Sequence, residues 1–149
     1  VVLNANGSIS RGGSTGAELL GIFNGCFYTD PTTSKPTFSN HYPGGIVASD
    51  IVANVITDPD VIFEVKVDDA NGGIAQVGST ANIATYSAGD TTSGISNVAL
   101  DGDSFATSSA SNFAVYALTT DVENNDYTVA NANILVRINK HQYRDTTGI

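Results

Sequence analysis

The chain has 149 residues, only 14% of them charged, and a net charge of −9. Its length suits one domain with a sizeable core, and its acidic excess argues against nucleic acid, because phosphate-backbone binding depends on Lys and Arg. No apolar run approaches the roughly 18 to 20 residues of a membrane-spanning helix, so we expect no membrane partner either.

The chain begins with strand character at residues 1–3 and contains no methionine, even at position 1. We therefore expect the complete protein to carry a further N-terminal arm before this strand. Asn6-Gly7 follows, and both residue types tolerate positive φ, which predicts a hairpin turn.

Cys26 is the only cysteine and lies among apolar neighbours. This environment predicts a small buried core residue, because no nearby cation lowers the pKa of the thiol. Asn24-Gly25 in the same stretch fits a β-bulge as well as a turn.

Residues 28–45 contain three of the four prolines, which predicts a long ordered loop or a protruding excursion. Aromatic side chains in and beside this segment could contact a partner or stack on sugar rings. These candidate loop contacts are Tyr28, Phe38, His41 and Tyr42.

Residues 50–56 carry apolar side chains at a helical spacing behind a possible Asp50 N-cap, but their β-branched content favours a strand. Residues 61–67 alternate apolar and polar side chains, which predicts a half-buried antiparallel strand. Asn71-Gly72 then predicts a second hairpin turn.

In the second half, residues 88–96 are rich in Gly, Ser and Thr and should form a surface loop. Residues 113–118 are apolar on both faces, which indicates a central or doubly covered strand. Residues 134–138 alternate again, with Arg137 on the polar side. A basic tail, about 139–149, follows this last strand.

Alternating strands separated by frequent turns predict an all-β protein in a single domain, residues 1–149. We expect a compact antiparallel β-sandwich or β-barrel, jelly-roll-like, with long loops. The pattern alone leaves sandwich and barrel open, because both produce short alternating strands.

The sequence offers little for catalysis or metal binding. Gly102-Asp-Ser-Phe105 resembles the nucleophile block of Gly-Asp-Ser-Leu esterases, but no Asp followed two residues later by His comes after it, so Ser104 is interpreted as a turn serine. Short Asp pairs could chelate calcium, yet Asp also favours turns and none continues into an EF-hand spacing. His41 and His141 lie too far apart in sequence for a zinc helix.

Positive charge is concentrated near the end of the chain. Three of the six basic residues fall within eight positions, interleaved with aromatic rings. An exposed Arg can bind carboxylates bidentately and Tyr brings rigid apolar area, so this segment could contact a neighbouring subunit; alternatively it solubilises the chain end. The candidate contacts are Arg137, Lys140, His141, Tyr143 and Arg144.

Three blocks of sequence carry a resemblance to a known family. They are residues 58–68 (Asp-Pro-Asp-Val-Ile-Phe-Glu-Val-Lys-Val-Asp), residues 93–96 (Ser-Gly-Ile-Ser) with Leu100-Asp101, and residues 136–143 (Val-Arg-Ile-Asn-Lys-His-Gln-Tyr) closed by residues 147–149 (Thr-Gly-Ile). In order and spacing they resemble small head proteins of tailed bacteriophages, described as structural, decoration or cement proteins. In that family a further stretch precedes an opening like Val-Val-Leu-Asn.

The resemblance implies a mainly β structural protein on the outer surface of the virion, bound to the major capsid protein and often trimeric. It brings no catalytic residues and no cofactor, so we expect a protein that is not an enzyme. A trimer would place apolar residues of 113–118 between or near subunits. The alternative from another class is a carbohydrate-binding or adhesive β-module that uses the aromatic residues of the proline-rich loop.

Overall fold

The structure is a computed structural model that describes residues 1–13, 16–84, 88–90 and 92–144. Within these ranges the regular structure is almost entirely β, apart from two short 3₁₀ turns, η1 (Ile74–Gln76) and η2 (Gly102–Ser104). All strand pairs within the sheets are antiparallel. The predicted all-β antiparallel class is confirmed.

The strands form three sheets. The first is the hairpin of β1 (Val2–Leu3) and β2 (Ile9–Ser10). The second has three strands in the order β4 (Pro36–Ser39), β3 (Ile22–Thr29), β5 (Val52–Ile56). The third has four strands in the order β6 (Phe63–Lys66), β9 (Asn133–Ile138), β8 (Phe113–Leu118), β7 (Thr80–Ala81). Each sheet is open in the described part of the chain. Separate antiparallel sheets are consistent with the sandwich class rather than with a closed barrel.

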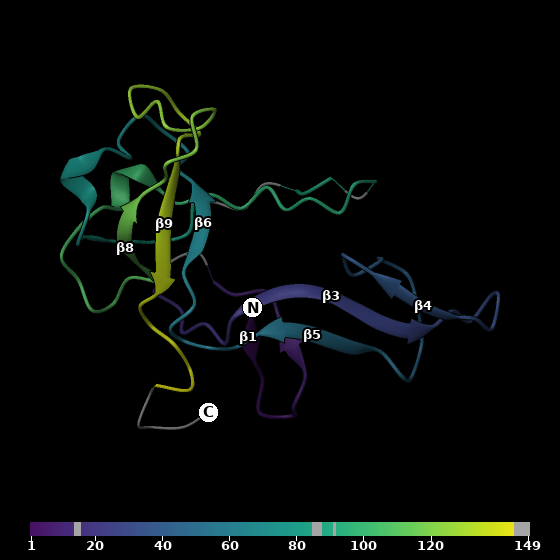
Figure 1. Cartoon of the computed structure of the whole chain (residues 1–149). Helices are drawn as coiled ribbons and strands as arrows, with labels where there is room; N and C mark the ends of the chain where they lie inside the picture. Colours follow the sequence, from purple (N-terminus) through teal and green to yellow (C-terminus); the bar gives the residue numbers. More distant parts are fainter. Residues whose placement is uncertain (14–15, 85–87, 91, 145–149) are drawn as a thin grey trace.

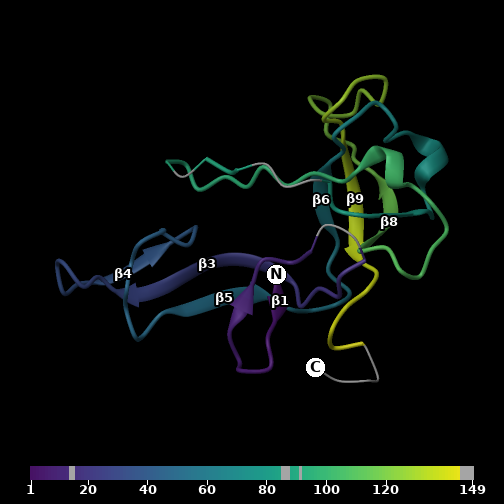
Figure 2. The same cartoon turned by 180° about the vertical axis from the view of Figure 1, so that it is seen from behind.

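The molecule is elongated. The four-stranded sheet forms a head, and the three-stranded sheet projects from it as a long extension, here called the β-arm (residues 22–56; Figures 1 and 2). The accessible surface is 8487 Å², against about 7,200 Å² for a compact monomer of 15.4 kDa. An excess of this kind is expected for a molecule in which the β-arm projects from the head instead of packing into it.

The core of the head lies on one face of the four-stranded sheet. Alternate residues of β9 point into it, so that Ile134, Val136 and Ile138 are buried while Arg137 is exposed on the other face. Segments from the rest of the chain cover this face. The strands predicted at 61–67 and 134–138 are therefore confirmed. The remaining buried core residues are Leu19, Val67, Ala81, Ile83, Leu100, Phe113 and Val115.

Strand β8 is central in the sheet, as predicted, because it lies between β9 and β7. It is not covered on both faces. A register shift between Val115 and Ala117 interrupts its pairing with β9, and the intervening Tyr116 is 58% exposed. Of the two predicted alternatives, the central strand is thus the one observed, and alternation places Tyr116 on the face opposite the buried Phe113 and Val115.

Two of the three Asn-Gly predictions hold. Asn6-Gly7 lies in the turn between β1 and β2, where Gly7 has φ +81°. Asn24-Gly25 forms a bulge in β3: the pairing with β5 shifts between Phe23 and Cys26, and Gly25 has φ +100°. A Cβ on Gly25 would lie 2.6 Å from the Ser39 carbonyl oxygen, so the position requires glycine.

The hairpin predicted at Asn71-Gly72 is wrong. The chain continues into η1, and β6 pairs with the distant β9 rather than with the next strand. Asp69 holds Asn71 by accepting hydrogen bonds from its backbone N–H at 2.9 Å and its side-chain amide at 2.8 Å. Gly72 packs against Val67 instead of providing a tight turn.

Residues 50–56 contain strand β5, which confirms the strand interpretation; Asp50 accepts hydrogen bonds from Thr29 rather than capping a helix. Residues 28–45 protrude as predicted, but much of the segment is the β3–β4 hairpin rather than a loop. Cys26 is buried, also as predicted.

No helix in the described ranges is long and apolar enough to cross a bilayer.

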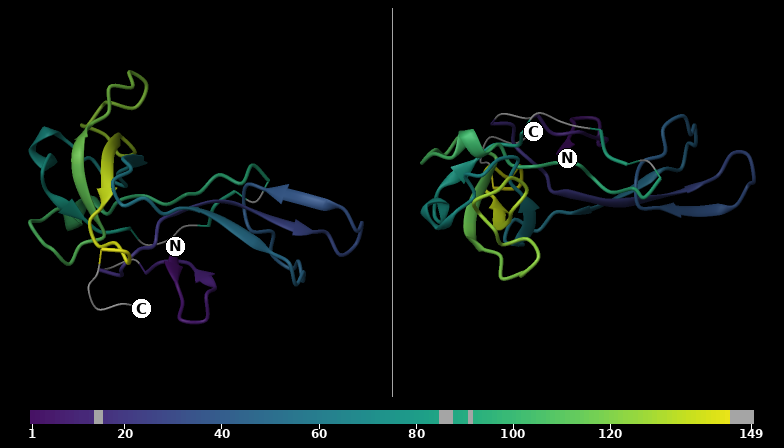
Figure 3. Two further views of the ribbon diagram at one scale, coloured as in Figure 1. Left: turned by 60° about the horizontal axis from the view of Figure 1, so that its bottom comes forward. Right: turned by 90° about the horizontal axis from the view of Figure 1, so that it is seen from above.

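Two smaller segments accompany the β-arm. The side hairpin, residues 88–90 and 92–99, runs beside the β-arm and carries a bridge between Asp90 and Ile95. It is joined to the β-arm by the Asn40 side-chain amide, which donates to the Ser93 carbonyl at 2.9 Å. The β1–β2 hairpin lies below the junction of head and β-arm (Figure 3).

Candidate contact surfaces on the β-arm and C-terminal segment

The outer face of the β-arm carries three apolar side chains in one row. Phe27 on the central strand β3 is paired directly with Phe38 on β4 and with Val52 on β5. Side chains at paired positions lie on the same face of a sheet. Phe27 is 44% exposed, Phe38 63% and Val52 59%. These residues form the apolar row.

The rest of this outer face is uncharged. By strand alternation the neighbouring positions on the same face are Thr29, Pro36 and Asn54. The nearest carboxylate, Asp50, lies just before β5, where the Thr29 backbone N–H donates to both of its oxygens at 3.2 and 3.1 Å. Hydrogen bonding by the Thr29 side chain, and secondarily by its backbone N–H, lowers the pKa of the Asp50 carboxyl. Asp50 therefore borders the outer face at the Thr29 end, and the positions around Phe27, Phe38 and Val52 carry no charge although the chain is strongly acidic.

The inner face of the β-arm is covered by the chain itself. Cys26 and Tyr28 are buried there, and the Cys26 Sγ lies 3.6 Å from the His41 carbonyl oxygen. Burial raises the pKa of the Cys26 thiol. His41 is held by its Nδ1, 2.8 Å from the Asn40 Oδ1. One face of the sheet is therefore packed and the other is bare.

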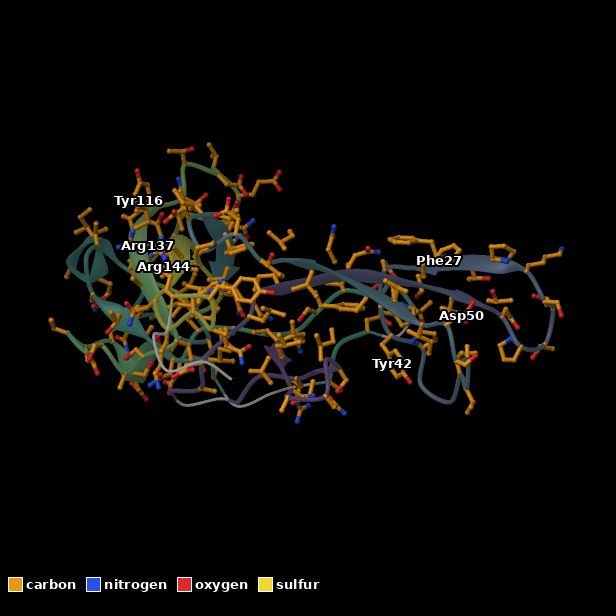
Figure 4. All side chains as sticks on the ribbon, turned by 90° about the horizontal axis from the view of Figure 1, so that it is seen from below. Phe27, Tyr42, Asp50, Tyr116, Arg137 and Arg144 are labelled. Atoms are coloured by element: carbon orange, nitrogen blue, oxygen red, sulfur yellow. The ribbon has the colours of Figure 1, made fainter. Side chains whose placement is uncertain are left out.

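Of the predicted loop contacts, Tyr28 is corrected by the structure. It is only 5% exposed because alternation in β3 turns it towards the covered face. Phe38 and Tyr42 are exposed, and His41 is half-buried. Figure 4 shows Phe27 and Tyr42 on opposite sides of the β-arm, so the aromatic residues do not form one platform.

Sequence reasoning missed Phe27 and Val52. Both lie in apolar runs that resemble core, and nothing local indicates which alternate residues face outward. The available signal is the alternation itself, Cys26 and Tyr28 against Phe27, which places Phe27 on the face opposite the buried cysteine.

The C-terminal segment is docked as far as Arg144. The Leu19 N–H donates to the Lys140 carbonyl at 2.8 Å, and the Gln142 N–H donates to the Leu19 carbonyl at 2.9 Å. The Gln142 side chain bonds both backbone groups of Leu3, at 2.7 and 3.1 Å. Residues 139–144 are thus fixed to residues 3 and 19 through a bridge at His141 and a turn at 142–144 rather than extended as a tail, and residues 145–149 lie outside the described ranges.

The two cations of this segment have acidic partners. Lys140 Nζ lies 3.5 Å from a Glu18 carboxylate oxygen and donates to the Gly16 carbonyl at 3.1 Å. Arg144 pairs with Asp60. Tyr143 and Arg137 are exposed, the latter on the outer face of β9. Arg137 and Tyr143 are therefore the most accessible members of the predicted contact set, whereas Lys140 and Arg144 are half-exposed and ion-paired.

His141 is corrected as a surface contact, because it is only 2% exposed. Its Nδ1 accepts a hydrogen bond from the Tyr143 N–H at 3.1 Å, so the neutral ring carries its proton on Nε2. Nε2 has no hydrogen-bond partner among the described residues. Burial, and secondarily the charge of Arg144, lower the pKa of His141.

The carboxylates and the serine considered for chemistry serve loop structure. Ser104 Oγ donates to the Asp101 carbonyl at 2.6 Å and accepts from the Asn82 N–H at 2.9 Å. Asp68 accepts from the Gly102 N–H at 2.9 Å. In the described ranges, no three His, Cys, Asp or Glu side chains gather closely enough to hold a metal ion.

The outer face of the four-stranded sheet is a second open surface. Figure 4 shows Tyr116 close to Arg137 in projection, on neighbouring strands β8 and β9. This pair offers an aromatic ring and a guanidinium, which are enriched at protein interfaces.

No protein-family model, curated protein or solved structure matches this chain.

Proposed function

We propose that this protein is a non-enzymatic structural component of a phage virion, a decoration or cement protein that binds the outside of the head. In this role it bridges neighbouring subunits of the major capsid protein. The observation that carries the proposal is the β-arm, a projecting sheet with one packed face and one bare, uncharged, apolar face. Exposed apolar faces of this kind mark protein contacts, whereas small-molecule sites are concave.

The dimensions of the β-arm suit a bridging role. Strand β3 has eight residues and extends about 26 Å at roughly 3.3 Å per residue. The strand begins at the head and ends beyond it (Figure 1). A protein whose head is fixed on one capsid subunit can therefore place the β-arm on the next. The resemblance of residues 58–149 to phage head proteins supports the same assignment.

Trimeric assembly is part of the proposal, because several weak interfaces engaged together raise avidity without new contacts. The structure changes which residues are available for it. Phe113 and Val115 belong to the core of their own head and are not free to pack between subunits. The outer-face pair Tyr116 and Arg137 is the accessible surface of these strands, and we assign the subunit contact to it.

The proposal is tested by measuring whether the protein occurs in purified virions. We expect it at a fixed stoichiometry to the major capsid protein, and we expect purified protein to rebind capsids from which it has been stripped. Absence from virions, or failure of the intact protein to rebind, contradicts the proposal.

The second candidate function is carbohydrate binding or adhesion. It is favoured by Phe38 and Tyr42, both exposed on the β-arm, and weakened by the burial of Tyr28. Glycan-array binding that is lost on Tyr42→Ala or Phe38→Ala would favour this function. Binding to stripped capsids with no glycan signal would favour the cement role.

A further inference from the structure

The apolar row has no partner within the described chain. The segment after β4 covers the inner face, where Cys26 and Tyr28 lie, and leaves Phe27, Phe38 and Val52 exposed. Strands β4 and β5 are both edges of their sheet, and no described strand pairs with their outer edges. An open apolar face and two open edges thus occur on the same projecting element.

The exposed area limits which partner can occupy this face. If a fully exposed aromatic side chain contributes about 200 Å², the apolar row offers on the order of 300 Å². Two copies stacked face to face would then bury about 600 Å² between their rows, well below the roughly 1,200 to 2,000 Å² of a stable interface. A second copy of the chain is therefore a poor occupant.

Charge restricts the partner further. Apart from Asp50 at its border, the outer face carries no charged residue, and a charge placed against the apolar row would lose water without gaining a partner. An anionic lipid surface repels a chain of net charge −9. Lys35 at the tip of the β3–β4 hairpin is the only cation of the β-arm. The matching surface is an uncharged apolar surface of another protein.

An apolar groove in the partner protein would meet both the requirement for a larger buried area and the requirement for an uncharged surface. Its floor can cover the apolar row while its walls bond the backbone of the β4 and β5 edges, which raises the buried area beyond that of two flat faces. We infer that the β-arm inserts into an apolar, uncharged groove of a partner protein, with Phe27, Phe38 and Val52 as its anchor. The inference rests on the proposed function, in which the partner is the capsid.

The test compares exposed apolar residues of the β-arm and of the head. Phe38→Ser and Phe38→Asp change the apolar row; Ile74→Ser and Val122→Ser change strongly exposed apolar residues of the head and serve as matched controls. Binding to stripped capsids is measured by co-sedimentation, and folding by circular dichroism. We expect Phe38→Ser to weaken binding about tenfold, as for an interface anchor, Phe38→Asp to weaken it more, and both controls to bind as the wild type.

The outcomes separate the two claims. If the wild type does not bind, the proposed function fails and the inference with it. If the wild type binds and the folded Phe38 variants bind equally well, the inference alone is overturned. It is also overturned if ultracentrifugation shows self-association that Phe38→Asp abolishes, or if the wild type sediments with phosphatidylcholine vesicles and Phe38→Asp does not.

Discussion

Neighbouring residues of β3 have opposite environments, since Cys26 and Tyr28 are buried and Phe27 between them is exposed. The burial of Cys26 could be predicted from its apolar neighbours. The orientation of Tyr28 could not, because a proline-rich segment after an apolar strand indicates exposure, and only the pairing of β3 with two partners determines which face is covered. The same limit applies to His141. Its basic neighbours suggest a surface position, although Leu19 hydrogen-bonds the backbones of Lys140 and Gln142 on either side of it.

At this scale we predict that His141 makes stability fall in mild acid. Its pKa is lowered in the folded protein by burial and by Arg144, while the backbone of Thr57, the charge of Asp58 and the backbone of Leu20 oppose the shift. The unfolded chain therefore binds more protons as the pH falls below the unfolded His value of about 6.5, and the free energy of unfolding decreases from there towards the folded pKa.

Urea unfolding between pH 7.5 and 5 measures this effect. The loss should be smaller in His141→Gln, which cannot titrate. The carboxyls of Asp50, Asp90, Asp121 and Asp126 have lowered pKa values, so their contribution is lost only in stronger acid and does not overlap this window. An unchanged pH dependence in His141→Gln would contradict the assignment.

At the scale of elements, regular alternation was the reliable signal. It predicted the strands at 61–67 and 134–138, because one covered face imposes period two on the side chains. It could not predict that these two distant segments pair with each other, nor that Asn71-Gly72 leads into η1. Both outcomes depend on contacts that alternation does not report. The first is the antiparallel pairing of β6 with β9, and the second is the hydrogen bond that Asp69 accepts from the Asn71 N–H.

Strand β9 provides a test of the head core. Ile134 is fully buried and Leu135 is half-buried on the other face of the same strand. Ile134→Ala should lower the free energy of unfolding by about 2 to 5 kcal/mol, because it removes packed volume from a core that cannot fully collapse. Leu135→Ala should cost clearly less. Equal decreases in the free energy of unfolding of the two variants, measured by denaturant titration, would contradict the described burial of one face of β9 and partial exposure of the other.

The bulge of β3 provides a test of the β-arm. Gly25 combines positive φ with close contact to the Ser39 carbonyl, so Gly25→Ala should destabilise by more than about 1 kcal/mol. Gly44 has open space around its α-carbon, and Gly44→Ala should stay within about 0.5 kcal/mol of the wild type. Thermal unfolding of both variants measures the difference, and a neutral Gly25→Ala would argue against the bulge geometry.

At the scale of the whole molecule, the antiparallel all-β class followed from the sequence, whereas the elongated shape did not. Apolar strands of the β-arm and of the head look alike in composition, and only the long-range pairing separates Phe27 on an open face from Ile134 in a core. The shape is the feature that connects the fold to a bridging function, because a projecting sheet can contact a subunit that the head does not touch.

The most direct test of the bridging function is a cryo-electron microscopy reconstruction of the virion that contains this protein. The account predicts density for the head on the outer surface of the capsid, with the β-arm crossing to a neighbouring capsid subunit and Phe27, Phe38 and Val52 facing that subunit. A capsid without this density, or a protein confined with its β-arm to a single subunit, would contradict it.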